Sequence, residues 1–169
     1  CAARPRTRGL VPKVMQDHFS TLQPVWVEQH LKLLCALRQV FGSDLDKPII
    51  LGVIGQRHFA TVVEPYSHAE ALQHGPPADM SRLTNVESIA NATGIPRETV
   101  RRKVVEMVEA GWVVKGPHGR LSVTADATAA LAGATDTANN MLDVTFEALA
   151  GALVADGLLK VEVPPADQG

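Results

Sequence analysis

Residues 88–113, "SIANATGIPRETVRRKVVEMVEAGWV", contain the signals of two short helices joined by a tight turn. Asn85, just before this stretch, is a candidate N-cap, and Glu87 or Ser88 completes a capping-type start. Gly94 supplies a positive φ, and Pro96 favours the first turn of a new helix. The sequence therefore predicts a short first helix after Asn85 and a second helix over 96–110.

Apolar residues recur in both segments at helical spacing, about 100° per residue. The small Ala90, the turn residue Gly94 and the buried Val100 have the spacing that a helix-turn-helix needs for close crossing. We expect two inward faces, formed by Val86, Ile89 and Ala90 in the first helix and by Val100, Val104, Met107 and Val108 in the second.

A β-hairpin is predicted directly after the second helix. Residues 112–115 and 120–124 alternate like strands, and Gly116-Pro117-His118-Gly119 between them has turn composition. A hairpin in this place would be a wing over 112–124. Residues 85–124 are therefore interpreted as a winged helix-turn-helix region, and the fold class as mainly α with a small hairpin, flanked by N- and C-terminal helices.

This region resembles the winged helix-turn-helix of bacterial transcription regulators, and residues 97–102, "RETVRR", are most similar to the cyclic-AMP receptor protein family. In that family the Arg, Glu and second Arg of the motif read base edges in the major groove. The resemblance implies these roles for Arg97, Glu98 and Arg102. It does not extend to nucleotide binding, because residues 1–84 read as mostly helical rather than as the family's β-roll.

The flanking helices are similar in arrangement to the MarR family of dimeric repressors, in which such helices form the dimer interface. Arginine can bond bidentately to guanine, and glutamate can accept from cytosine, each pair giving about 1–3 kcal/mol of discrimination. We expect double-stranded DNA as the partner, with Arg97, Glu98, Thr99, Arg101 and Arg102 in the major groove and Lys103, Lys115, His118 and Arg120 at the phosphates.

Charge is distributed unevenly along a chain whose net charge is −2. Residues 95–120 hold six Lys or Arg against three acids, whereas residues 122–169 hold seven acids against Lys160 alone. The basic stretch over 95–120 is thus suited to bind a polyanion, whereas the acidic stretch over 122–169 is not. A winged helix that docks a protein without binding DNA stays open as the alternative.

The sequence contains none of the phosphate-loop, nucleophile-elbow or His-Glu-x-x-His motifs, so we expect no enzyme, cofactor or metal. His68 and His74 lie near acids but have no recognised zinc spacing. Cys1 and Cys35 fit no disulfide framework. With no membrane-spanning apolar run, a cytoplasmic protein is expected.

The N-terminal part divides into an extended basic arm over 1–19 and a helical region over 20–84. Its helices are predicted over 24–41 and from Ser43 or Asp46 onward, with a buried strand over 49–54 as the alternative to the second. A connection rich in proline follows over 64–85.

Residues 125–169 form the predicted C-terminal helical region, which is weakly specified until a helix over 138–159. Leu142, Phe146, Leu149 and Leu153 recur there at spacings of four, three and four. This helix could fold back onto its own domain or pack against a second copy. Because a stripe of the same spacing lies within 26–40, we expect the two stripes to share a homodimer interface. A small apolar effector that binds in a pocket between these flanking helices stays an open alternative.

Overall fold

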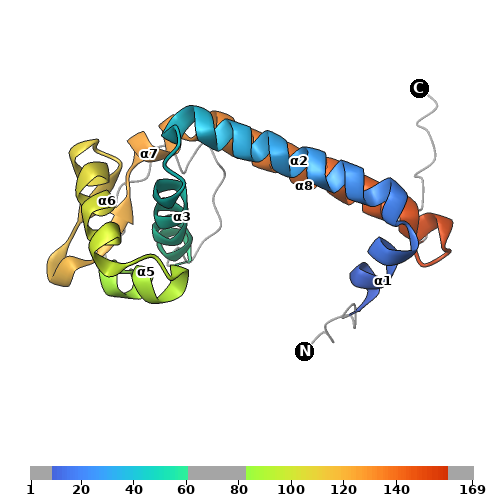
Figure 1. The fold of residues 1–169 in the computed structure, drawn as a ribbon, viewed down its shortest axis with the longest axis horizontal. Helices are drawn as coiled ribbons and strands as arrows, with labels where there is room; N and C mark the ends of the chain where they lie inside the picture. The colour runs from blue at the N-terminus through green and yellow to red at the C-terminus, as the bar shows by residue number, and fades with distance from the viewer. Residues whose placement is uncertain (1–8, 61–82, 160–169) are drawn as a thin grey trace, which may run out of the picture. The chain divides into compact units, whose positions relative to one another are not determined.

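The computed structural model describes residues 9–60 and 83–159. The fold is mainly helical with one small antiparallel sheet, which confirms that part of the prediction. The elements in chain order are α1 (Leu10–Asp17), α2 (Phe19–Phe41), α3 (Asp46–Phe59), α5 (Val86–Thr93), α6 (Arg97–Glu109), β1 (Val113–Lys115), a 3-10 turn η1 (Pro117–Gly119), β2 (Leu121–Val123), α7 (Ala125–Ala130) and α8 (Ala132–Ala155) (Figure 1). None of the helices within the described ranges is long and apolar enough to cross a membrane.

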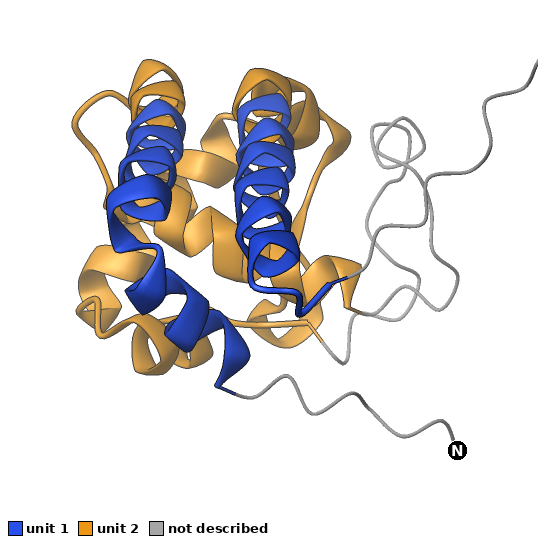
Figure 2. Cartoon of the chain, turned by 90° about the vertical axis from the view of Figure 1, so that its right-hand side faces the viewer, with its two compact units in different colours: residues 1–34, 136–169 blue, residues 35–135 orange. Residues whose placement is uncertain are grey.

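The chain divides into two compact units (Figure 2). Unit 1 comprises residues 1–34 and 136–169, and unit 2 comprises residues 35–135. The helices α2 and α8 contribute to both units. The candidate site lies wholly within unit 2.

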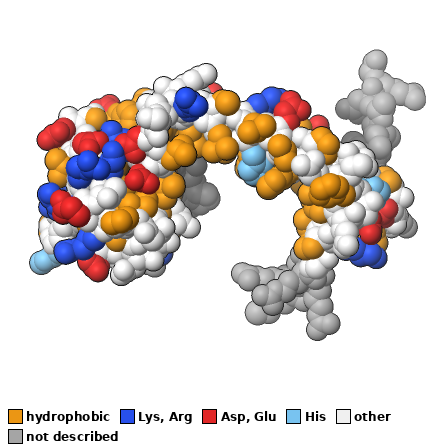
Figure 3. Space-filling view, in the orientation of Figure 1, with side chains coloured by type: hydrophobic (Ala, Val, Ile, Leu, Met, Phe, Trp, Pro, Cys, Tyr) orange, Lys and Arg blue, Asp and Glu red, His pale blue; other side chains and the backbone are white. Residues whose placement is uncertain are grey.

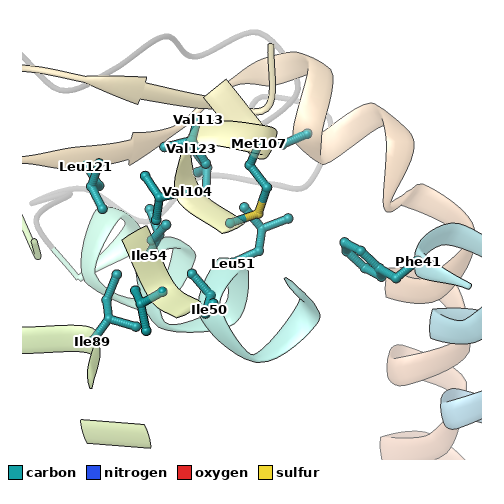
Figure 4. Packing of buried hydrophobic residues seen from close by; sticks show 12 residues of the cluster. Phe41, Ile50, Leu51, Ile54, Ile89, Val104, Met107, Val113, Leu121 and Val123 are labelled. Carbon is teal, nitrogen blue, oxygen red and sulfur yellow. The ribbon is translucent and has the colours of Figure 1, made fainter. Parts of the chain in front are cut away.

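Unit 2 has an aliphatic core in which α3 packs against α5, α6 and β2. Ile50, Ile54 and Ile89 have no exposed surface (Figure 4). Phe41 and Trp112 add an edge-to-face aromatic contact with ring centroids 5.6 Å apart. The core cluster consists of Phe41, Ile50, Leu51, Ile54, Ile89, Val100, Val104, Met107, Val113, Leu121, Val123 and Ala127.

The turn between α5 and α6 forms as the sequence predicts. The Asn85 side chain accepts a hydrogen bond from the Ser88 N–H at 2.9 Å and so caps α5. Gly94 ends α5 with a φ of 74°. Because α6 begins three residues later at Arg97, the charged residues of "RETVRR" occupy its first turns.

The hairpin is confirmed over slightly shorter strands, with Val113 paired to Val123 and Lys115 to Leu121. His118 in its turn has a φ of 54° and a ψ of 23°, the left-handed region that L-residues rarely adopt. A buried hydrogen bond of 2.9 Å between Ser122 Oγ and His58 Nδ1 joins β2 to α3. The hairpin is therefore fixed to the core through β2.

Unit 1 contains α1 and most of α2 and α8, and the two long helices run antiparallel within it (Figures 1 and 2). The buried hydrophobic side chains among its described residues are Val14 and Leu22. A pocket of about 220 Å³ lies among the three helices. Ten large apolar side chains among the described residues of the unit are exposed instead, namely Val11, Phe19, Trp26, Leu31, Leu34, Leu142, Phe146, Val154, Leu158 and Leu159.

The predicted extended arm is wrong over residues 10–17, which form α1. The apolar residues Leu10, Val11, Val14 and Met15 have helical spacing, and Val14 is buried. This pattern spans only two turns, which is why the sequence did not reveal it. Residues 1–8 of the arm lie outside the described residues.

Other boundaries also differ from the predictions. The second helix was expected to be capped by Ser43 or Asp46, but the N-cap of α3 is Leu45, without a side-chain hydrogen bond. The alternative strand over 49–54 is wrong, because this segment is helical and buries Ile50, Leu51 and Ile54 on one face. Val108 was expected in the core, yet it is 38% exposed.

The C-terminal helix begins earlier than expected. α8 starts at Ala132 and ends at Ala155, and the Thr124 side chain caps α7 before it by accepting from the Ala127 N–H at 3.2 Å. The predicted connection over 64–85, with His68 and His74, lies almost wholly outside the described residues. Within the parts that the structure describes, no cluster of His, Cys, Asp or Glu could hold a metal ion.

Candidate nucleic-acid interface

A groove of about 570 Å³ lies where the first turns of α5 and α6 face the hairpin turn. Five of the nine residues predicted to contact DNA line it. It is lined by Asn85, Val86, Glu87, Arg97, Glu98, Arg101, Lys115, His118 and Gly119. Residues from three elements, up to 34 positions apart in the sequence, therefore share one surface.

The two faces of α6 explain why these charges point outward. Val100, Val104 and Met107 are buried on the core side of the helix. Residues 97, 98, 101 and 102 are all exposed on its other sides. The helix is thus anchored along its length while its first two turns present charged groups to solvent (Figure 3).

Arg97 forms an ion pair with Glu87 of the preceding helix. The Nε atom of Arg97 lies 2.8 Å from Oε2 of Glu87, and the two side chains are 74% and 60% exposed. Sequence reasoning had placed Glu87 only in the capping of α5. Its contact with Arg97 depends on how the two helices cross, and the local pattern contains no signal for it.

Arg101 is bound by Glu98 one turn earlier on the same helix. Its Nε donates to both carboxylate oxygens at 3.0 and 2.9 Å, and its Nη2 donates to Oε1 at 2.6 Å. This hydrogen bond lowers the pKa of the Glu98 carboxyl and raises the pKa of the Arg101 guanidinium. Glu98 is therefore held as a carboxylate, which can only accept hydrogen bonds.

Arg102 and Thr99 lie outside the groove lining. Arg102 is exposed and forms no ion pair with any residue in the described ranges, whereas Thr99 is half-buried. Of the three arginines of the motif, Arg102 thus has the side chain least committed to partners within the protein.

Lys103 and Arg120 are bound within unit 2. Nζ of Lys103 pairs with Oδ2 of Asp44, in the connection between α2 and α3, and only 14% of the Lys103 side chain is exposed. Lys47 extends this network by pairing with Glu106 at 2.8 Å. Nη1 of Arg120 donates to the Leu83 carbonyl at 2.6 Å. Lys103 and Arg120, which were both predicted to contact phosphate, are therefore also bound to groups within the protein.

The network around Lys103 should make stability sensitive to acid. Burial alone would raise the pKa of Asp44, but the hydrogen bond and charge of Lys103, together with Lys47, outweigh it and lower this pKa below 3.8. A carboxyl whose pKa falls on folding stabilises the folded state above its unfolded pKa, and this contribution is lost as pH falls through the folded value.

We therefore expect Lys103→Met to lower the free energy of unfolding by about 1 kcal/mol at pH 7, and this difference from the native chain to shrink below pH 3.8. Urea unfolding at several pH values measures it. Lys32→Met, which removes an exposed pair with Glu28, is the control and should have a smaller effect. A difference that stays constant down to pH 3 would contradict the role of Asp44.

No protein-family model matches the chain, and neither the curated proteins nor the solved structures give a significant match. The function is therefore argued from the geometry of the groove and from the sequence.

Proposed function

We propose that the protein is a sequence-specific DNA-binding regulator of transcription and acts as a homodimer. In this proposal α5, α6 and the hairpin form a winged helix-turn-helix, with α6 in the major groove and the hairpin along the DNA backbone. One observation carries the proposal, which is the groove that gathers Arg97, Arg101, Lys115 and His118 beside the exposed first turns of α6.

The chemistry of the groove fits a duplex. Side chains at the exposed start of an anchored helix can reach base edges, while cations on the neighbouring hairpin can meet phosphates. Arg97, Glu98 and Arg102 supply the donors and the acceptor that distinguish guanine and cytosine in the major groove. Lys115 adds a positive charge from the hairpin, and the His118 ring can donate a hydrogen bond, as a wing on the backbone requires.

The surface of unit 1 supports the homodimer. Trp26, Leu142 and Phe146 are 45%, 65% and 67% exposed, and apolar side chains are prominent along the long helices in Figure 3. A helix pair with so few buried apolar residues gains little from its own core, so a second copy that covers the same face is the simplest partner. The 220 Å³ pocket belongs to this surface, and we assign it to the interface rather than to an effector.

Fluorescence anisotropy tests the proposal. The full chain is titrated against duplexes selected from a random library and against a scrambled duplex, at two salt concentrations. Tight binding to the selected duplexes with a steep salt dependence is expected. Absence of binding at low salt would overturn the proposal and favour a winged helix that docks a protein.

Arg102→Ala is expected to weaken binding to the selected duplex by about 1–3 kcal/mol per half-site and to relax sequence preference at one base pair. The reason is that Arg102 is exposed without an ion-pair partner in the described parts of the chain. Arg57→Ala removes the same charge from the exposed surface of α3 and serves as the control. An equal loss on every sequence would show that Arg102 contacts only phosphates.

A further inference from the structure

The ion pair between Glu87 and Arg97 joins two helices at the edge of the groove. It differs from the pair of Glu98 and Arg101, which lies within one helix and engages both Nε and Nη2 of the arginine. The contact of Arg97 is made at Nε, 2.8 Å from Glu87. The contact is an ion pair without a well-aligned hydrogen bond, and the terminal Nη groups of Arg97 form no hydrogen bond with any residue that the structure describes.

This geometry leaves Arg97 suited to bind a base. An arginine reads guanine by donating two parallel hydrogen bonds to O6 and N7. A carboxylate at Nε leaves both Nη groups available for such donation and restricts the rotation of the guanidinium. Arg101, in contrast, would first have to leave Glu98.

Apart from the favourable place of its charge in the first turn of α5, Glu87 has no other evident task among its described neighbours. The capping of α5 is done by the Asn85 side chain, which accepts from Ser88 rather than exchanging bonds with Glu87. Glu87 is too exposed to contribute to the core, and an exposed ion pair adds little to folding stability. The pair would strengthen when DNA covers the groove and displaces water.

We propose that Glu87 is a positioning residue that holds Arg97 for base recognition and so determines part of the sequence preference. This inference rests on the proposed DNA binding. In this role Glu87 contributes to selectivity even though its negative charge repels the DNA phosphates. Removing that charge should therefore tighten non-selective binding without tightening selective binding.

The test compares Glu87→Gln with the native chain on a selected duplex and on a scrambled duplex of the same length. We expect binding to the scrambled duplex to tighten, because a negative charge near the phosphates is removed, and binding to the selected duplex not to tighten. The ratio of the two affinities should fall by about three- to ten-fold. Glu109→Gln, which removes an exposed charge near the end of α6, should leave the ratio unchanged.

The double variant Glu87→Gln with Arg97→Gln separates positioning from general charge. Its affinity ratio should equal that of Arg97→Gln alone, because the effect of Glu87 passes through Arg97. Equal tightening on both duplexes would show that Glu87 acts only as a charge, and weaker binding to both with a lower melting temperature would show that it only fastens the helices. Either result overturns this role alone. A native chain that binds neither duplex would overturn it together with DNA binding.

Discussion

A chain in which Leu142 and Phe146 are both replaced by glutamate is expected to sediment as a monomer at concentrations where the proposed homodimer of the native chain forms. The two side chains are 65% and 67% exposed and lie four residues apart on α8. Burying a carboxylate against an apolar face of the partner costs far more free energy than the apolar contact at that position contributes to the interface. Because neither side chain is in a core, the helical content should stay unchanged.

The same variant should bind an operator with two half-sites about 10²–10⁴-fold more weakly, since the second half-site is no longer bound by a linked subunit. The control is Gly151→Glu with Ala155→Glu, which adds two carboxylates to exposed positions on the opposite side of α8. It should remain dimeric. A double variant at Leu142 and Phe146 that still sediments as a dimer would show that another surface mediates self-association.

Ile54→Ala is expected to lower the free energy of unfolding of the chain by about 2–5 kcal/mol. Ile54 has no exposed surface and comes from α3, the helix that packs on α5, α6 and β2 (Figure 4). Removing three carbon atoms leaves a cavity at the centre of these elements, so the loss includes a cavity term as well as the lost burial.

Urea unfolding measures this loss, with Val105→Ala as the control. Val105 is 44% exposed on α6, and its truncation should change the free energy of unfolding by no more than about 0.5 kcal/mol. A loss below about 1 kcal/mol for Ile54→Ala would contradict the central place of α3 in unit 2.

Local signals made much of unit 2 predictable. The cap at Asn85, the positive φ of Gly94 and the turn around Pro117 each depend on residues within a few positions, and the structure confirms all three. Helical periodicity also predicted Ile89, Val100, Val104 and Met107 of the core, although it wrongly included Val108. The helix α1 was missed because its apolar pattern is only eight residues long.

The pairings within the candidate site could not be predicted. Lys103 contacts Asp44, which lies 59 residues earlier in the chain, and Arg97 contacts Glu87 across a turn. Both contacts depend on how helices cross, and a sequence pattern does not contain that geometry. The predicted residues Arg97, Glu98, Arg101, Lys115 and His118 were nevertheless brought to one groove, because the first three follow the turn at Gly94 and the last two lie at or within the turn around Pro117.

The two tryptophans of the chain give each unit its own optical reporter. Trp112 lies against Phe41 in the core of unit 2, whereas Trp26 is 45% exposed in unit 1 and lines its pocket. With Trp26→Phe, the emission of the remaining indole should follow the unfolding of unit 2. With Trp112→Phe, the emission should shift to the blue as the chain is concentrated and a second copy covers Trp26, so that core stability and self-association can be followed separately in one chain.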